Sequence, residues 1–203
     1  DHQALLRVEV EELGRHLLLV VQDAVEDPRT RISVENARNL GRARPGDRLA
    51  RQDGDERHVA GVAAAVVLPE GLIIEELDDS KKLTEKKREK LYDEIVSSAV
   101  AFGIAESSPA EIDEYNILNA SLLAMRRAVE MVREKISPSV VLIDGNRQSD
   151  FGCPSVTVVK GDAKSQSIAA ASVLAKTHRD EHMRALAQKY PGYGWERNMG
   201  YPT

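Results

Sequence analysis

The chain has 203 residues, a net charge of −5 and one cysteine, Cys153, and 42% of its residues are hydrophobic. This length and composition are typical of one soluble α/β domain, or of one domain with an appendage, and the longest apolar runs are too short to cross a membrane. The acidic balance argues against tight non-specific binding to nucleic acid. The lone cysteine excludes an internal disulfide and the start of the sequence has no export-signal pattern, so we expect a cytoplasmic protein.

The first part of the chain differs in composition from the rest. Residues 1–60 contain ten arginines and no lysine. Residues 29–58 are polar and have no sustained helix or strand period, so we predict that residues 1–58 form a divergent, largely irregular segment. Within it, residues 4–27 have the pattern of a helix, or of a helix followed by a short strand. A domain boundary is expected near residue 58, with one domain over 59–203.

The sequence after this boundary becomes regular. Residues 59–69 read as a buried strand that ends at Pro69, and residues 71–77 as a further strand end. A helix is expected over 84–103, with Thr84 as its N-cap and Gly103 as its stop.

The second half continues the alternation of helices and strands. Ser108 and Glu111 form a capping-box pattern, and a longer helix then runs up to Pro138. Strands are expected at 140–143 and 155–159, and a last long helix at 165–190. Strands interleaved with helices predict an α/β fold with a mixed sheet.

Two aspartates follow apolar strands at comparable places. Asp144 comes directly after the run 140–143 and begins an Asp-Gly-Asn turn pattern, and Asp162 follows the next strand. Ligands gather at the carboxyl ends of strands in such sheets, where two carboxylates would suit Mg²⁺ or Mn²⁺ and metal-assisted hydrolysis. Ordinary turn chemistry explains an isolated Asp-Gly equally well, and the strand pattern alone leaves both interpretations open.

Five motifs point to a known family. The segments "DDSKKLTEKKREKLYDEI", "NILNASLLAMRRAV", "LIDGNR", "VVKGDAKSQSIAAASVLAKTHRDEHM" and "YPGYGWERNMGYPT" resemble ribonuclease HII in order and spacing, over about residues 61–203. The resemblance implies an RNase H-like fold, with a central mixed β-sheet flanked by helices. It also implies an endonuclease that cuts the RNA strand of RNA–DNA hybrids and single ribonucleotides in duplex DNA. Its cofactor would be Mn²⁺ or Mg²⁺, and we expect a monomer.

The resemblance assigns roles to individual residues. Asp144 and Asp162 match catalytic, metal-binding aspartates of the family, and Tyr201 in "GYPT" matches the tyrosine that lies against the nucleotide at the RNA–DNA junction. Three lysines, where the family would meet substrate phosphates, are the further substrate-binding candidates: Lys81, Lys82 and Lys176. For these lysines, an ordinary solvated charge is the alternative interpretation.

The match breaks before residue 61. The family begins with an apolar strand, an Asp-Glu pair and a glycine-arginine-glycine loop that reads the ribose 2′-hydroxyl. Aligned without gaps, the acidic pair falls on Ala50 and Arg51, and with a five-residue deletion it falls on Asp55 and Glu56. No such loop is present in either case. Asp55 and Glu56 are therefore either catalytic metal ligands or part of a solvated charged stretch. A catalytically impaired, hybrid-binding remnant of the family remains the alternative function.

The last long helix contains further titratable residues. We interpret Asp180, next to Arg179, as part of a structural ion pair and not as a ligand. His178 and His182 do not form a His-Glu-x-x-His zinc motif, and we expect them at the surface.

Overall fold

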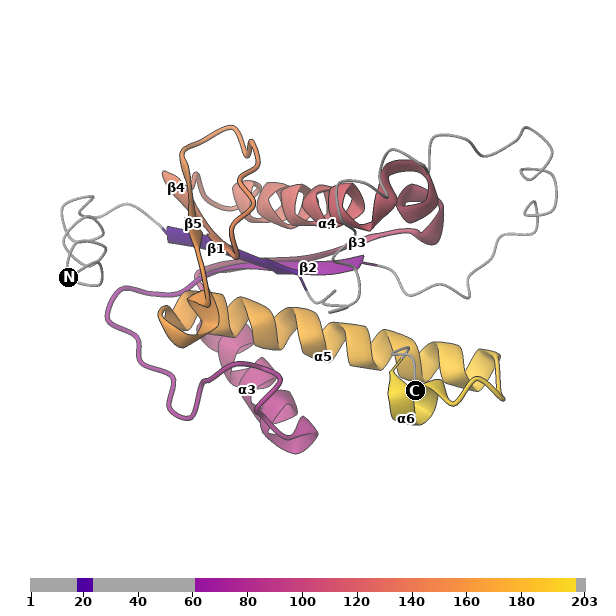
Figure 1. Ribbon diagram of the computed structural model, residues 1–203. Helices are drawn as coiled ribbons and strands as arrows, with labels where there is room; N and C mark the ends of the chain where they lie inside the picture. Colours follow the sequence, from indigo (N-terminus) through magenta and orange to yellow (C-terminus); the bar gives the residue numbers. More distant parts are fainter. Residues whose placement is uncertain (1–17, 24–60, 200–203) are drawn as a thin grey trace.

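A five-stranded mixed sheet forms the centre of the protein, which the computed structural model describes for residues 18–23 and 61–199 (Figure 1). The strands are β1 (Leu18–Asp23), β2 (Gly61–Val67), β3 (Ala101–Ser107), β4 (Val140–Asp144) and β5 (Ser155–Val158). Their order across the sheet is β3-β2-β1-β4-β5. The pairs β1–β2 and β2–β3 are antiparallel, and β1–β4 and β4–β5 are parallel. The predicted α/β fold with a mixed sheet is confirmed.

Helices cover both faces of this sheet. They are α3 (Glu85–Ser98), α4 (Pro109–Arg133), α5 (Gln166–Lys189) and the short α6 (Trp195–Asn198), with a 3₁₀ turn η3 (Gly161–Ala163) before α5. In Figure 1, α4 lies on one side of the sheet, and α5 and α3 lie on the other. Within the described ranges, none of the helices combines the length and the apolar character that crossing a bilayer requires.

Strand β2 is buried at every position, because it separates two apolar cores. Ala64 packs in the core on the α5 side, and Ala63 and Ala65 pack in the core on the α4 side. Successive residues of a strand alternate between the two faces, so a continuously apolar sequence is what a sheet covered on both sides requires. The small alanine side chains let the helices of both layers approach the sheet closely.

Several expected elements form at the expected places. The strands at 59–69, 140–143 and 155–159 are β2, β4 and β5, and the last long helix is α5. The capping box is confirmed, since the Ser108 hydroxyl accepts from the Glu111 backbone and the Glu111 carboxylate accepts from the Ser108 backbone. Strand β1 lies within the segment 1–58, where a short strand was one of the expected elements, and it is the middle strand of the sheet. The helix expected before it lies outside the described residues.

Two predictions between residues 71 and 107 were wrong. Residues 71–77 form turns and no strand, and the helix that begins after Thr84 ends at Ser98, before Gly103. Gly103 lies in β3, where a Cβ atom would approach the Ala128 carbonyl oxygen of α4 to 2.4 Å. The glycine therefore allows a helix to pack closely on the strand, and does not end a helix.

Helix α4 contains a kink at Asn116. Its backbone there has φ 67° and ψ 164°, values outside the helical region. The kink divides a short first helix, opened by the capping box, from the long second one, so the two helical pieces expected from the sequence join end to end.

Candidate active site

Asp144 and Asp162 lie near one another at one edge of the sheet. Asp144 is the last residue of β4, and Asp162 belongs to η3, in the connection from β5 to α5. Both side chains are partly exposed. The two strands are parallel neighbours, so their carboxyl ends meet at the same edge, as the sequence pattern indicated.

The turn between β5 and α5 fixes the position of the Asp144 carboxylate. The Gly161 backbone N–H donates a hydrogen bond of 2.7 Å to Asp144 Oδ1. A Cβ atom on Gly161 would lie 2.3 Å from Ile168 Cδ1 and 3.0 Å from Asp144 Oδ1, so a side chain here would force these neighbours to shift. Lys160, just before it, has a left-handed backbone with φ 55° that turns the chain into η3. The backbone of the Lys160-Gly161-Asp162 segment thus holds the Asp144 carboxylate in place and brings Asp162 to the same edge of the sheet.

The charge of Asp162 acts on the Asp144 carboxylate. Burial raises the pKa of Asp144 above its ordinary value of 3.8, and the nearby charge of Asp162 raises it further. The Gly161 hydrogen bond and the charge of Lys81 act in the opposite direction. A bound cation would stabilise the ionised form of a half-buried carboxylate that lies beside a second one.

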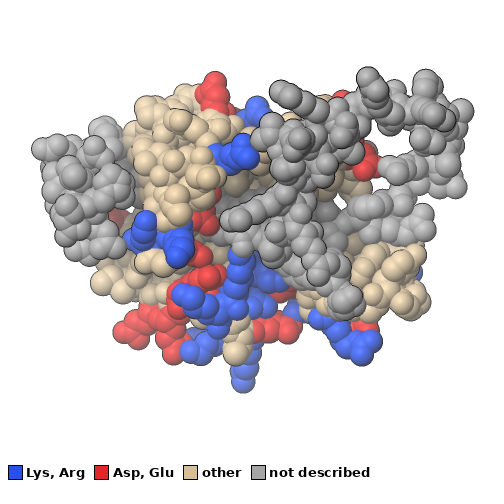
Figure 2. Space-filling model, in the orientation of Figure 1, with Lys and Arg blue, Asp and Glu red and all other residues tan. Residues whose placement is uncertain are grey.

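Two lysines of the loop before α3 approach this acid pair. Lys81 lowers the pKa of Asp144, and Asp162 contributes to the raised pKa of Lys82, after the larger effect of Asp78. Lys82 Nζ lies 3.0 Å from Asp78 Oδ1 at the surface. On the face shown in Figure 2, Lys and Arg side chains mix with Asp and Glu where Figure 1 places α3, and do not form a patch of one sign.

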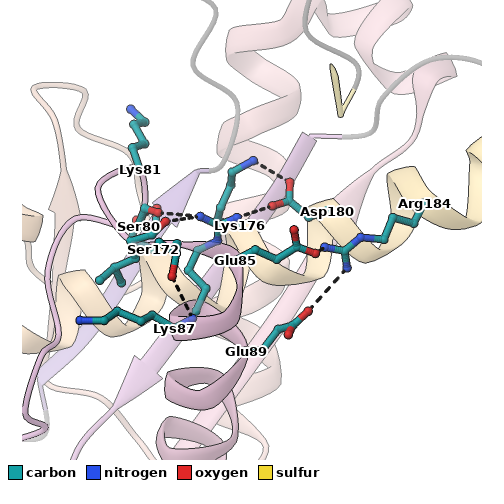
Figure 3. Close-up of polar contacts among 12 residues, drawn as sticks. Ser80, Lys81, Glu85, Lys87, Glu89, Ser172, Lys176, Asp180 and Arg184 are labelled. Atoms are coloured by element: carbon teal, nitrogen blue, oxygen red, sulfur yellow. Dashed lines mark hydrogen bonds and ion pairs between the residues drawn. The ribbon is translucent and has the colours of Figure 1, made fainter. Parts of the chain in front are cut away.

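Buried polar contacts anchor the loop that carries these lysines. Ser80 Oγ lies 2.7 Å from Ser172 Oγ of α5. Arg88 of α3 donates to the carbonyls of Ser80 and Leu83, and its Nη2 lies 3.0 Å from Asp180 Oδ2. In Figure 3, Ser80, Ser172 and Asp180 lie along α5, and Lys81 extends away from them. The loop is therefore tied to two helices at the site.

Asp180 is 3% exposed and forms two ion pairs. Its partners are Arg88 and Lys176, the latter at 2.6 Å. The expected structural role is confirmed, although the partners differ from the neighbouring Arg179 that the sequence suggested. Lys176 is 15% exposed in this pair, and its contact with substrate stays a prediction.

The two histidines have a shared partner that the sequence did not predict. His178 and His182 are partly exposed at the surface, and α5 directs both toward β3. His178 Nε2 lies 2.8 Å and His182 Nδ1 3.3 Å from Glu106 Oε1. Their i, i+4 spacing is the sequence signal for a shared partner, but the identity of that partner depends on the tertiary fold.

The remaining predicted site residues lie outside the described part of the chain. These are Asp55, Glu56 and Tyr201. Their roles stay predictions.

The described residues offer part of a metal site. Asp144 and Asp162 supply the hard oxygen ligands that Mg²⁺ and Mn²⁺ prefer, and a bound cation would offset the charge of Asp162 that raises the pKa of Asp144. Among residues 18–23 and 61–199, however, no three His, Cys, Asp or Glu side chains come together in a metal-binding group. The two aspartates fit one divalent ion as two of its ligands.

Comparison with known sequences agrees with this geometry. The sequence profile of ribonuclease HII matches residues 58–203. The chain belongs to the ribonuclease HII family. The ribonuclease HII of Parabacteroides distasonis is 55% identical over 142 residues, which cover 70% of each chain. That of Ruegeria pomeroyi is 57% identical over 143 residues, 70% of this chain and 60% of the relative.

Solved structures share the fold of this chain. The crystal structure of ribonuclease H2 from Pyrococcus horikoshii has a TM-score of 0.65 at 22% identity, and covers 92% of this chain and 81% of the other. Ribonuclease HII in the PCNA complex from Archaeoglobus fulgidus has a TM-score of 0.57 at 19% identity, with 92% and 91% covered. These likenesses confirm the RNase H-like fold expected from the sequence motifs.

Proposed function

We propose that this chain hydrolyses the RNA strand of RNA–DNA hybrids, including single ribonucleotides in duplex DNA, with a divalent metal ion. Mn²⁺ and Mg²⁺ are the candidate ions. We further propose that it acts as a monomer in the cytoplasm, where the free thiol of Cys153 suits a reducing environment.

One observation carries the proposal. In a chain of the ribonuclease HII family, Asp144 and Asp162 lie together at the carboxyl edge of the sheet, and Lys81 and Lys82 interact with this acid pair. Acidic groups for a metal ion beside basic groups for phosphates are the combination that phosphodiester hydrolysis requires.

The protein's own groups position the reactants. The Gly161 N–H and the end of β4 fix the Asp144 carboxylate, while η3 presents Asp162. Lys81 and Lys82 lie where they would attract the phosphates that flank the scissile bond. A bound divalent ion would supply activation of water and stabilisation of the charge on the leaving 3′ oxygen.

The test is cleavage of a labelled DNA duplex that contains one ribonucleotide, with Mn²⁺ and with Mg²⁺. We expect cuts at the ribonucleotide, and also within the RNA strand of a hybrid, that stop when EDTA is added. An all-DNA duplex of the same sequence is the matched control and should stay intact. Equal cutting of the all-DNA duplex would refute ribose selection.

A second candidate is hybrid binding without efficient cleavage. The observation that favours it is the small number of carboxylates that the described residues bring together. It predicts that the chain retards a hybrid in a gel-shift assay while the labelled strand remains uncut in Mn²⁺. Cleavage at the ribonucleotide would exclude it.

A further inference from the structure

The end of β1 provides a further position beside Asp144. Strand β1 pairs in parallel with β4, and Val21 is the register partner of Ile143. Continued by one step along both strands, this register assigns position 22 to the place beside Asp144, the last residue of β4. Neighbouring parallel strands end at the same edge of the sheet, so position 22 belongs to the edge where the acid pair lies.

The register also assigns position 22 to a side of the sheet. Gln22 is the partner of Ala64 in β2, and Ala64 packs with Leu142 in the core under α5. Asp144 follows Leu142 by two residues, so it belongs to the same side. Positions 22 and 144 are therefore neighbours on the α5 side. Asp23, by contrast, is the partner of Ala63, which packs in the core on the α4 side.

The residue at position 22 is neutral. A glutamine offers an amide oxygen but no charge, and the affinity of a protein for a divalent ion follows the number of charged oxygen ligands. With Asp144 and Asp162, the set has two negative charges, whereas a pair of metal ions requires several carboxylates.

We infer that Gln22 limits cation binding in this chain, and that an aspartate at position 22 would complete a three-carboxylate set with Asp144 and Asp162. The inference rests on the proposed function, because it takes the acid pair as the metal site. In the alternative arrangement, Asp55 and Glu56 supply the remaining carboxylates of the metal site. The present inference instead assigns the missing negative charge to position 22 of β1.

The test compares three forms of the full chain by calorimetric titration with Mn²⁺. Gln22→Asp should bind Mn²⁺ about tenfold more tightly than the parent, or better, because one charged ligand is added. Gln22→Asn is the matched control, since it has the size of aspartate without the charge, and its affinity should stay near that of the parent. Gln22→Glu provides a second charged variant, and thermal unfolding without metal checks that each variant folds.

Two results would overturn the inference. The first is an equal Mn²⁺ affinity for Gln22→Asp, Gln22→Glu and Gln22→Asn when all three are folded. The second is loss of the parent's Mn²⁺ binding in the double variant Asp55→Asn, Glu56→Gln, because it would assign the missing carboxylates to that segment.

The cleavage assay separates this inference from the proposed function. If Gln22→Asp binds Mn²⁺ more tightly but cuts neither the hybrid nor the ribonucleotide-containing duplex, the inference stands and the proposed function fails. If the parent cuts both substrates and Gln22→Asp shows no gain in affinity, the function stands and the inference fails.

Discussion

At the residue scale, the Asp144 carboxylate is held in surroundings that disfavour its charge. Burial and the charge of Asp162 raise its pKa. Asp144→Asn should therefore leave the free energy of unfolding unchanged or slightly higher, because the neutral amide avoids this cost and still accepts from Gly161. Mn²⁺-dependent cleavage should be lost, since the amide lacks the charge that the ion needs.

Thermal unfolding without metal and single-turnover cleavage measure these two effects separately. Asp150→Asn is the control, because Asp150 is an exposed aspartate in the loop after β4 whose one hydrogen bond among the described residues comes from the Gly152 backbone. Turnover of Asp144→Asn within a few-fold of the parent would remove this residue from the site.

Gly161 is the second residue of the site for which the structure predicts the effect of a substitution, because its neighbours leave little room for a side chain. Gly161→Ala should lower the free energy of unfolding by about 1–3 kcal/mol, because its Cβ would overlap Ile168 Cδ1. Cleavage should fall as well, since the same methyl group presses on the Asp144 carboxylate. Adding Ile168→Val removes Cδ1 and should recover part of the stability in a denaturant titration. No recovery would show that the cost arises elsewhere.

At the scale of elements, a buried ion pair joins α3 to α5. Arg88→Ala removes one of the two cationic partners that Asp180 has among the described residues, in a nearly water-free place, and also removes two hydrogen bonds to carbonyls. We expect a loss of about 3 kcal/mol in the free energy of unfolding. The site should weaken too, because Arg88 anchors the loop that carries Lys81.

The same two helices provide a matched control. Arg184 of α5 pairs with Glu85 and Glu89 of α3, but these carboxylates are about half exposed. Arg184→Ala should cost less than about 1 kcal/mol, because an exposed pair is screened by solvent. Equal losses for both variants in urea unfolding would mean that burial does not distinguish the two pairs.

The sequence predicted those elements whose pattern lies within a few consecutive residues. Strands β2 and β4 were predicted because both are continuously apolar, and the Ser108 capping box lies within four residues. Strand β3 was missed, since it is an edge strand that begins only three residues after Ser98, the end of α3. The role of Gly103 in this strand becomes clear only from the packing of α4 against it.

The contacts of the candidate site also divide into those that a local sequence pattern predicts and those that only the folded chain brings together. Asp144 and Asp162 each follow an apolar strand, so position along the chain was enough to select them. The contacts Ser80–Ser172 and Arg88–Asp180 each join residues 92 positions apart, and no local pattern encodes them. The fold also places β1 beside β4, and the polar sequence that follows β1 does not suggest this pairing.

At the scale of the whole molecule, the edge strand β3 and helix α5 are joined by a group of charges that depends on pH. Hydrogen bonds from His178 and His182 lower the pKa of Glu106 from 4.5 to about 2, and Glu106 raises the pKa of His182 above 6.5. The carboxylate therefore contributes stability that is present above pH 4.5 and is lost as the pH falls toward about 2. His182 contributes stability that is present below pH 6.5 and is lost as the pH rises through its folded pKa.

The two contributions overlap between about pH 4.5 and 6.5, so the advantage of the parent over Glu106→Gln should be greatest there and decline on both sides. Urea unfolding of both proteins from pH 3 to 9 measures this difference. Glu111→Gln is the matched control, because the pKa of Glu111 is also lowered to about 2, but by Arg127 and the Ser108 backbone, without a histidine. Its difference from the parent should decline only toward acid. If the Glu106→Gln difference likewise stays constant from pH 6 to 9, His182 does not share its proton with this carboxylate.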